Sequence, residues 1–322
     1  MPRLSRERID AARTGARRLA RRTAAIGYHS IVVPLLGRAE TEHALDLACR
    51  LAAQRSAQVL LVAPIVADYA LPLDAHFEEE SRELKQRLVR AEAIAKAHGV
   101  STKSRTVRTR GRALGRELAE VAHDHRAELV VVGAPVESRR GFRRAYPPEI
   151  RSILRDAPCR VMIVSGRIAR GAGEDEPALR RVLVPLKLGP IGKEMLGTAI
   201  KLAQEDAAEI CALHVVKVPL DQPLDSSVVD LEEQAAAALA EAALGGERSG
   251  VAVTGETIRD RSIGQAIIRV AADRGVDLIV LGSSPRWRRQ SRFFSPTVEY
   301  VLRMAPCEVL IVAFPQGVLD EA

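Results

Sequence analysis

The feature that most constrains the fold is an internal repeat. Three pairs of segments carry it: Gly115–Gly133 with Gly264–Gly282, Asp156–Val164 with Met304–Val312, and His29–Gly37 with Arg180–Gly189. The copies lie 151 residues apart near their starts and 148 or 149 residues apart further on. A long repeat of this kind indicates duplication of one domain, here of about 140 residues. The 322 residues of the chain can form two such domains, each with its own core.

Each copy alternates strand and helix patterns in the order β-α-β-α-β-α-β-α-β. The strands at 31–35, 129–132 and 161–164 are unbroken apolar runs, which is typical of strands buried on both faces. The alternation predicts a doubly wound α/β fold with a parallel five-stranded sheet in each copy. The predicted strands are His29–Leu35, Gln58–Pro64, Lys103–Thr109, Glu128–Gly133, Arg160–Ser165, Arg181–Leu186, Glu209–Val216, Val251–Ile258, Asp277–Gly282 and Glu308–Phe314. Helices of the first copy are predicted near Glu40–Arg55, Ala75–His98, Arg112–His125 and Pro148–Arg155.

The chain therefore divides into four predicted parts: a basic tail (1–28), a first domain (29–165), a linker (166–179) and a second domain (180–315). The linker is assigned because the stretch after Ser165 is rich in glycine and charge. In doubly wound sheets, ligands bind at the carboxyl ends of strands where the strand order reverses. We expect the site of each copy where its first strand ends and its fourth strand turns.

The net charge of +7 belongs mainly to the tail. Residues 1–28 hold eight of the 48 basic residues and two of the 41 acidic ones, so the remainder has 40 basic and 39 acidic residues. This near-neutral body does not favour a specific nucleic-acid interface. The tail has a helix-forming, arginine-rich composition. It is interpreted as a segment for an anionic membrane surface, as the end of a helix that begins upstream, or as a frayed extension.

Several functional classes lack support in the sequence. No apolar run approaches eighteen residues, so no membrane span is predicted. The four cysteines sit in apolar stretches without a C-x-x-C pair, which predicts buried thiols in a reducing, cytoplasmic compartment. No common hydrolase or metalloenzyme motif is present, so no catalytic residue and no metal ligand is assigned.

Several of these motifs resemble the universal stress protein family. They are the V-P that ends the first strand, the fourth strand that ends in glycine, and the A-P-C-x-V-x-I-V segment. The resemblance covers about residues 29–165 and 180–314. It implies the adenine-nucleotide alpha-hydrolase-like fold with strand order 3-2-1-4-5. The last strand of each copy would then be an exposed apolar edge, and pairing these edges gives an intramolecular pseudo-dimer. A further homodimer is left open.

Family members that bind ATP carry an aspartate two residues after the first strand's proline and a G-x2-G-x9-G-[ST] loop after the fourth strand. Here Leu36 and Lys187 occupy the aspartate position. Valine or proline replaces the second glycine, and prolines stand where the loop ends. Proline has no N–H for a phosphate, and valine resists the positive φ that glycine allows. The resemblance thus places degenerate nucleotide sites at Pro34, Leu36, Gly133 and Val136, and at Pro185, Lys187, Val215, Leu281, Gly282, Ser284, Pro285, Ser295 and Thr297.

Arginines have taken the place of the loop glycines. The two loops hold Arg139, Arg140, Arg143 and Arg144, and Arg286, Arg288, Arg289 and Arg292. They also hold five of the ten aromatic residues: Phe142, Tyr146, Trp287, Phe293 and Phe294. Arginine binds phosphates and carboxylates bidentately, so the loops fit an anion-binding or partner-docking surface. The plainer interpretation is a solvated loop with its aromatic residues tucked beneath it.

Three functions are compatible with these features. The first is a non-catalytic regulatory or stress-response protein without a cofactor, with degenerate nucleotide pockets and an unidentified protein partner. The second is a protein that binds ATP or another adenine nucleotide, mainly through its second domain. The third is a cytoplasmic regulatory module of a membrane transporter.

Overall fold

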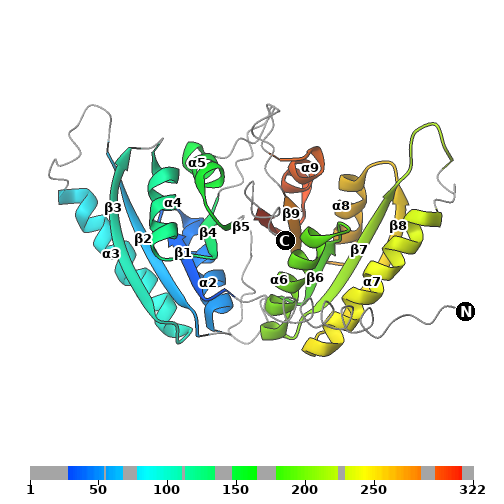
Figure 1. Cartoon of the computed structure of the whole chain (residues 1–322), viewed down its shortest axis with the longest axis horizontal. Coiled ribbons are helices and arrows are strands. Elements are labelled where there is room, and N and C mark those ends of the chain that lie inside the picture. Colours follow the sequence, from blue (N-terminus) through cyan, green and yellow to red (C-terminus); the bar gives the residue numbers. More distant parts are fainter. Residues whose placement is uncertain are drawn as a thin grey trace, which may run out of the picture.

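The chain forms two α/β halves that share a single sheet (Figure 1). The computed structural model describes residues 28–53, 56–67, 78–110, 113–134, 147–164, 179–223, 229–283 and 294–313. The first half contains β1 (Ser30–Pro34), α2 (Ala39–Ala53), β2 (Gln58–Ala67), α3 (Glu78–Ala97), β3 (Thr102–Arg110), α4 (Leu114–Asp124), β4 (Leu129–Gly133), α5 (Pro148–Asp156) and β5 (Arg160–Val164). The second half contains β6 (Arg181–Pro185), α6 (Pro190–Asp206), β7 (Glu209–Lys217), α7 (Val229–Ser249), β8 (Val253–Asp260), α8 (Ile263–Asp273), β9 (Leu278–Ser283), α9 (Pro296–Met304) and β10 (Glu308–Ala313). Every predicted strand is present.

The strand order is β3-β2-β1-β4-β5-β10-β9-β6-β7-β8. Each half therefore has the predicted order 3-2-1-4-5, with parallel pairing throughout. The predicted pairing of the two apolar edge strands is confirmed. The last strands β5 and β10 pair antiparallel, with Ile163 opposite Ile311, so the two sheets are continuous. Pairing these apolar strands removes both inner edges from solvent.

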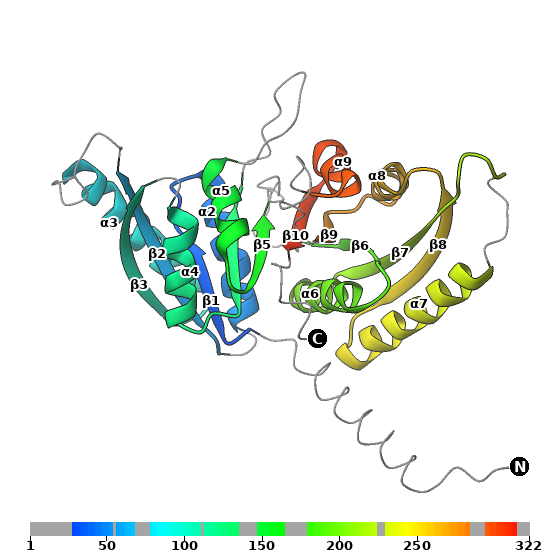
Figure 2. The same ribbon diagram turned by 45° about the horizontal axis from the view of Figure 1, so that its top comes forward.

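Helices cover both faces of the ten-stranded sheet (Figure 2). One apolar cluster joins side chains of α2, α3 and α6 to alternate strand residues, including Ile31, Val33 and Met162. The other joins α4, α5, α8 and α9 to the intervening residues, including Val32 and Ile163. Both clusters run through the two halves without a break. The sheet is thus a shared core, and each face of it is built from residues of both copies.

Polar side chains also join the two halves, beside the β5–β10 pair. Arg50 on α2 pairs with Asp206 on α6 at 3.0 Å, and both side chains are largely buried. The Tyr28 hydroxyl donates to Glu194 Oε1 at 3.2 Å, and Arg160 lies 3.0 Å from the same oxygen. Burial, together with the nearby Glu194 carboxylate, raises the pKa of Tyr28, so the phenol remains a neutral donor. These contacts hold α6 against α2, β5 and Tyr28 of the first half.

The four cysteines are free thiols. Cys49 and Cys159 are buried, and burial raises the thiol pKa of each from 9.0 to about 12. Cys307 shows the same shift to about 12 although it is partly exposed. Low-dielectric surroundings disfavour the thiolate, which is the reactive form. The prediction of buried thiols is confirmed for three of the four, and Cys307 is the exception.

We expect alkaline pH to destabilise the protein through Cys49 and Cys159. Unfolded thiols lose their protons near pH 9, whereas the folded thiols keep them to about pH 12. Their contribution is therefore fully present below pH 9 and is lost as pH rises from 9 towards 12. Each thiol should lower the free energy of unfolding by about 1.4 kcal/mol per pH unit in that window. Urea unfolding at pH 8 and pH 10.5 measures the slope, and equal slopes in wild type and a Cys49→Ala/Cys159→Ala variant would contradict this account.

Among the helices that the structure describes, none combines the length and apolarity needed to cross a membrane.

Candidate functional site

The candidate sites lie where β1 and β6 part from their neighbours β4 and β9. Pairing between β1 and β4 covers only Ile31–Leu129 and Val32–Val130, and pairing between β6 and β9 covers only the two equivalent positions. Both pairings stop before the carboxyl ends of the strands. These are the points where the strand order reverses, and a ligand site is expected there in a doubly wound sheet.

In the first half, the main chain of α2 closes tightly over the end of β4. A Cβ atom added to Gly133 would lie 2.1 Å from the carbonyl oxygen of Glu40 and 2.8 Å from the amide nitrogen of Thr41. Pro34 is buried, and Leu36 is partly buried against the cluster formed by α4 and α5. The family's aspartate position is therefore an apolar contact in this half, and Gly133 is required for helix–strand packing.

An ion pair crosses the same site. Arg38 Nη2, from the turn after β1, lies 3.4 Å from Glu149 Oε2 in the first turn of α5. Glu149 follows Pro147 and Pro148, neither of which has an N–H to donate. A helix N-terminus normally favours an anion through free amides and its dipole. Here Glu149 places a carboxylate in the first turn of α5, and that carboxylate pairs with Arg38.

The second half has a different set of groups at the equivalent place. Lys187 is exposed, and Thr297 stands at the second residue of α9, where α5 has Glu149. Ser295 caps the helix, because its hydroxyl accepts the Val298 amide at 3.3 Å. Pro296 supplies no N–H. The first acidic residue of α9 is therefore Glu299, two residues beyond the position that Glu149 has in α5, and neither Pro296 nor Val298 offers a free amide.

The remaining predicted residues of the second half belong mainly to the core. Val215 and Leu281 are buried in the cluster formed with α8 and α9. Gly282 faces α6, where an added Cβ would lie 2.4 Å from side-chain atoms of Ile191 and Met195. Pro185 is half-buried at the end of β6. The strand ends and the helix start of this site are therefore at Pro185, Gly282 and Ser295. Buried beneath them are Val215 and Leu281.

One contact at this site was not predicted as such. His214 Nδ1 lies 3.2 Å from the Leu186 carbonyl oxygen, which ties β7 to the turn after β6. The backbone of the same turn lies against α6, since a Cβ on Gly192 would fall 1.9 Å from the carbonyl oxygen of Lys187. The main chain around Lys187 is therefore held from two sides while its side chain extends into solvent.

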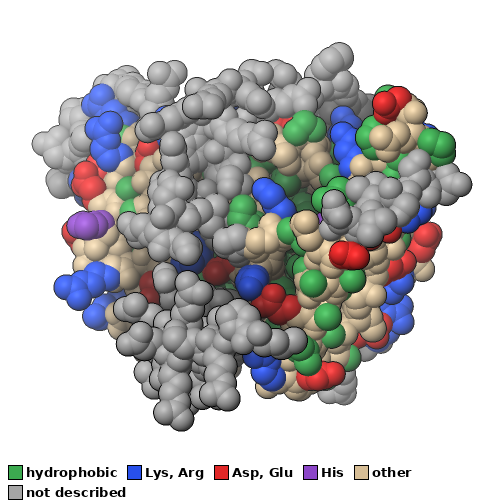
Figure 3. Space-filling view, turned by 45° about the vertical axis from the view of Figure 1, so that its right-hand side comes forward, with side chains coloured by type: hydrophobic (Ala, Val, Ile, Leu, Met, Phe, Trp, Pro, Cys, Tyr) green, Lys and Arg blue, Asp and Glu red, His purple; other side chains and the backbone are tan. Residues whose placement is uncertain are grey.

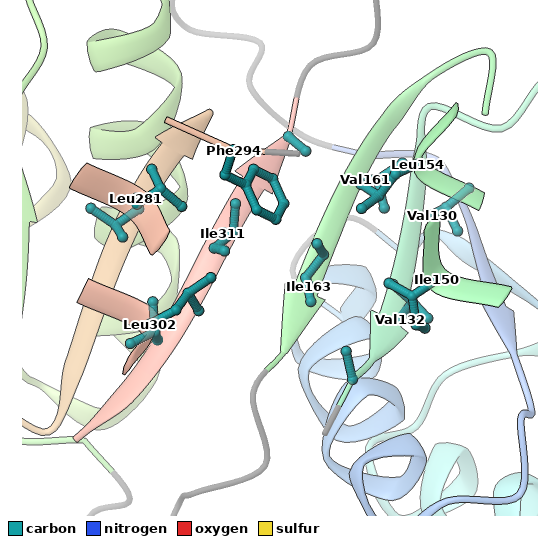
Figure 4. Packing of buried hydrophobic residues seen from close by; sticks show 14 of the residues in the cluster. Val130, Val132, Ile150, Leu154, Val161, Ile163, Leu281, Phe294, Leu302 and Ile311 are labelled. Carbon is teal, nitrogen blue, oxygen red and sulfur yellow. The ribbon is translucent and has the colours of Figure 1, made fainter. Parts of the chain in front are cut away.

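Several predicted residues lie outside the described part of the chain. They are Val136, Ser284, Pro285 and the eight arginines of the two loops. Phe294 is described, and it is 2% exposed in the core beside Ile311 (Figure 4). Phe294 is therefore buried, as the plainer interpretation expects of the aromatic residues. Over the face in Figure 3, basic and acidic side chains are interspersed across the described surface.

The structure adds a cavity that the sequence did not indicate. It lies between α2 and α3 in the first half, has a volume of about 240 Å³, and is lined by Leu35 and Gly37 from the turn after β1. Within the ranges that the structure covers, no group of three or more His, Cys, Asp or Glu residues could hold a metal ion.

A duplicated 3-2-1-4-5 sheet joined through its last strands defines a tandem doubly wound α/β protein. The model of the universal stress protein family matches residues 27–165 and 178–313. The chain therefore belongs to the universal stress protein family. This membership supports a stress-response protein.

Solved structures agree with this fold. A universal stress protein from Archaeoglobus fulgidus DSM 4304 is 16% identical with a TM-score of 0.61, over 88% of this chain and 95% of the other. A protein of unknown function from Pseudomonas aeruginosa PAO1 is also 16% identical, with a TM-score of 0.57 over 93% of this chain and 97% of the other. A search of curated proteins gives no match.

Proposed function

We propose that this chain is a non-catalytic regulatory or stress-response protein that acts through protein partners and whose nucleotide pockets have degenerated. The observation that carries the proposal is the Arg38–Glu149 pair, with 3.4 Å between Nη2 and Oε2. A carboxylate at the start of α5 opposes a bound triphosphate by like-charge repulsion and by occupying the positive end of the helix. Arg38, the cation at this point, is already paired.

The second pocket supports the proposal for a different reason. The Ser295 hydroxyl is committed to the Val298 amide, and Pro296 has no N–H. A phosphate cradle depends on several converging backbone amides. Lys187 stands where ATP-binding members carry the aspartate that meets adenosine, so an acceptor has been replaced by a donor. The groups that would bind the phosphates and the residue that would bind the nucleoside are thus both altered in this pocket.

Thermal-shift and calorimetric titrations with ATP, ADP, AMP and cyclic nucleotides, with and without Mg²⁺, test this proposal. A ligand that binds only the folded state at 100 times its Kd stabilises that state by about 2.7 kcal/mol. We expect no saturable shift up to millimolar nucleotide. A saturable shift would reject the proposal for whichever pocket is responsible.

The second candidate function is nucleotide binding by the second half with altered chemistry. It is favoured by Lys187, which is an exposed cation, and by Thr297, an uncharged residue at the helix position where α5 has Glu149; the carboxylate in the first turn of α9, Glu299, lies two residues further on. If this function is correct, Lys187→Ala should weaken nucleotide binding about tenfold or more. Lys193→Ala is the matched control, because Lys193 is an exposed lysine of the same half that pairs with Glu241 at 2.9 Å. Equal affinity in both variants would exclude Lys187 as the recognition residue.

The proposal places the protein in the cytoplasm. Support comes from the four free thiols, since free cysteines persist in reducing compartments. We also propose that the basic tail contacts an anionic membrane surface. Residues 1–27 of this tail lie outside the described ranges, and its last residue, Tyr28, is buried.

A further inference from the structure

The cavity between α2 and α3 lies on the sheet face opposite to α4 and α5. Its apolar wall is formed by Leu35, Leu45, Ala91 and Ile94. Leu35, Leu45 and Ala91 belong to the cluster on the α2–α3 face, whereas Leu36 belongs to the other face. The cavity therefore opens on the other face of the sheet from Leu36, although it shares Arg38 and Thr41 with the degenerate nucleotide site. Its volume of about 240 Å³ is below the range of about 300–1,000 Å³ typical for drug-sized ligands, which suits a small metabolite.

The polar side of the cavity is positively charged. Arg38 enters from the β1–α2 turn, Arg87 and Arg90 lie one turn apart on α3, and the one acidic residue of the lining is Glu42. Arg87 pairs with Glu83 at 2.8 Å, but both side chains are more than a third exposed, so this pair is weak and exchangeable. Because Arg38 pairs with Glu149 at 3.4 Å, the positive charge beside the apolar wall comes mainly from Arg87 and Arg90.

Gly37 is required for this arrangement. Its φ is +71°, and an added Cβ would lie 2.5 Å from Arg87 Cζ and 2.6 Å from Arg87 Nη1. The guanidinium of Arg87 therefore lies directly against the main chain where α2 is about to begin. An anion held there meets the guanidinium groups, whereas Glu40 and Glu42 in the first turn of α2 offset the dipole of that helix.

The second copy shows that the fold does not require these charges. At the 151-residue offset, Ala238 corresponds to Arg87, Glu241 to Arg90, and Lys193 to Glu42. Lys193 and Glu241 form a direct ion pair at 2.9 Å between α6 and α7. The same pair of helices thus packs in the second half with one arginine absent and the remaining charges reversed. Packing alone does not account for the two arginines in the first half.

We propose that the first-half cavity binds a small organic anion, a carboxylate or phosphate that carries a short aliphatic chain. The anionic head lies at Arg87 and Arg90, and the chain lies against Leu45, Ala91 and Ile94. Arginine suits either head group because its fork matches both geometries. The apolar wall selects molecules with a chain over the bare ions.

Calorimetric titration of the full chain with four probes tests this site: sodium hexanoate, hexyl phosphate, sodium acetate and inorganic phosphate. We expect saturable binding of at least one hexyl probe, tighter than binding of the corresponding short anion. The tighter of the two hexyl probes identifies the head group as carboxylate or phosphate. Saturation by neither hexyl probe at about ten millimolar, which corresponds to a free energy of binding weaker than about 3 kcal/mol, would overturn the proposal.

Variants on α3 locate the binding. Arg87→Ala and Arg90→Ala should each weaken the hexyl probe about tenfold or more, since each removes a charge-assisted hydrogen bond. Arg90→Glu, which copies the second half, should abolish binding. Arg82→Ala is the matched control, because Arg82 is exposed on the same helix and does not line the cavity. Equal losses in Arg82→Ala and Arg87→Ala would overturn the proposal, and thermal unfolding of each variant confirms that the fold is retained.

Discussion

Changing Gly133 to alanine is expected to lower the free energy of unfolding by about 3 kcal/mol or more, because the new methyl group has no room. An added Cβ lies 2.1 Å from the Glu40 carbonyl oxygen and 2.3 Å from the carbonyl carbon. These are main-chain atoms in the first turn of α2, so the helix as a whole would have to move away from β4. Urea unfolding followed by circular dichroism measures the loss.

Two other glycines serve as controls for this substitution. Gly99 has a φ of +66° and no atom within 4 Å of an added Cβ, so Gly99→Ala should cost only the backbone strain of about 1 kcal/mol. Gly282 is the counterpart of Gly133, but its near neighbours are side chains of Ile191 and Met195 that can shift. Gly282→Ala should therefore cost less than Gly133→Ala. A Gly133→Ala variant no less stable than Gly99→Ala would show that α2 is free to move.

Ile311→Ala should lower the free energy of unfolding by about 2 to 5 kcal/mol, the range for removing a large aliphatic side chain from a core. Ile311 is fully buried on β10 and lies opposite Ile163 of β5, where the two halves meet (Figure 4). The loss leaves a cavity in a cluster that both halves share. We expect one cooperative transition in which both halves unfold together, measured by calorimetry and by denaturant unfolding.

Val66→Ala is the matched control for the β5–β10 pair, because Val66 is a strand residue that is 49% exposed. It should change stability by no more than about 0.5 kcal/mol. The double variant Ile163→Ala/Ile311→Ala should depart from additivity by about 0.5 kcal/mol or more, since the two residues face each other. Two separate transitions in Ile311→Ala would instead mean that each half is stable alone.

The fold was predictable because its signals are local or repeated. Unbroken apolar runs such as 129–132 identify strands buried on both faces, and the second copy confirms each element independently. The pairing of the two sheets could be predicted because each has an apolar strand at its edge. The antiparallel register of this pairing could not be predicted. Strand ends differ from prediction by up to three residues, as at β2, which continues to Ala67. Nothing in the sequence of β2 marks its end, since Ile65 and Val66 continue the apolar pattern.

The sequence located the strand ends at which the candidate sites lie, but it did not indicate which side chains make contact there. Motif spacing located Gly133 and Lys187, yet it could not show that Arg38 reaches Glu149, 111 residues away. The cavity beside Arg87 depends on how two helices pack, which one sequence does not specify. One signal was present, however. Comparing the copies at the 151-residue offset places arginines opposite Ala238 and Glu241, and unequal charges within a repeat indicate positions that are free to diverge.

The covalent joining of the two copies has a consequence for how the protein behaves on dilution. Two separate subunits dissociate when the protein concentration falls below their dissociation constant. Two tethered domains instead have an effective local concentration that does not change with dilution. Here the contact between β5 and β10 is made within one chain, so its integrity is independent of the amount of protein in the cell. The stoichiometry of the two halves is also fixed at one to one. A symmetric dimer must carry the same substitution twice, but this chain can change one copy alone, as the differing residues along α3 and α7 illustrate.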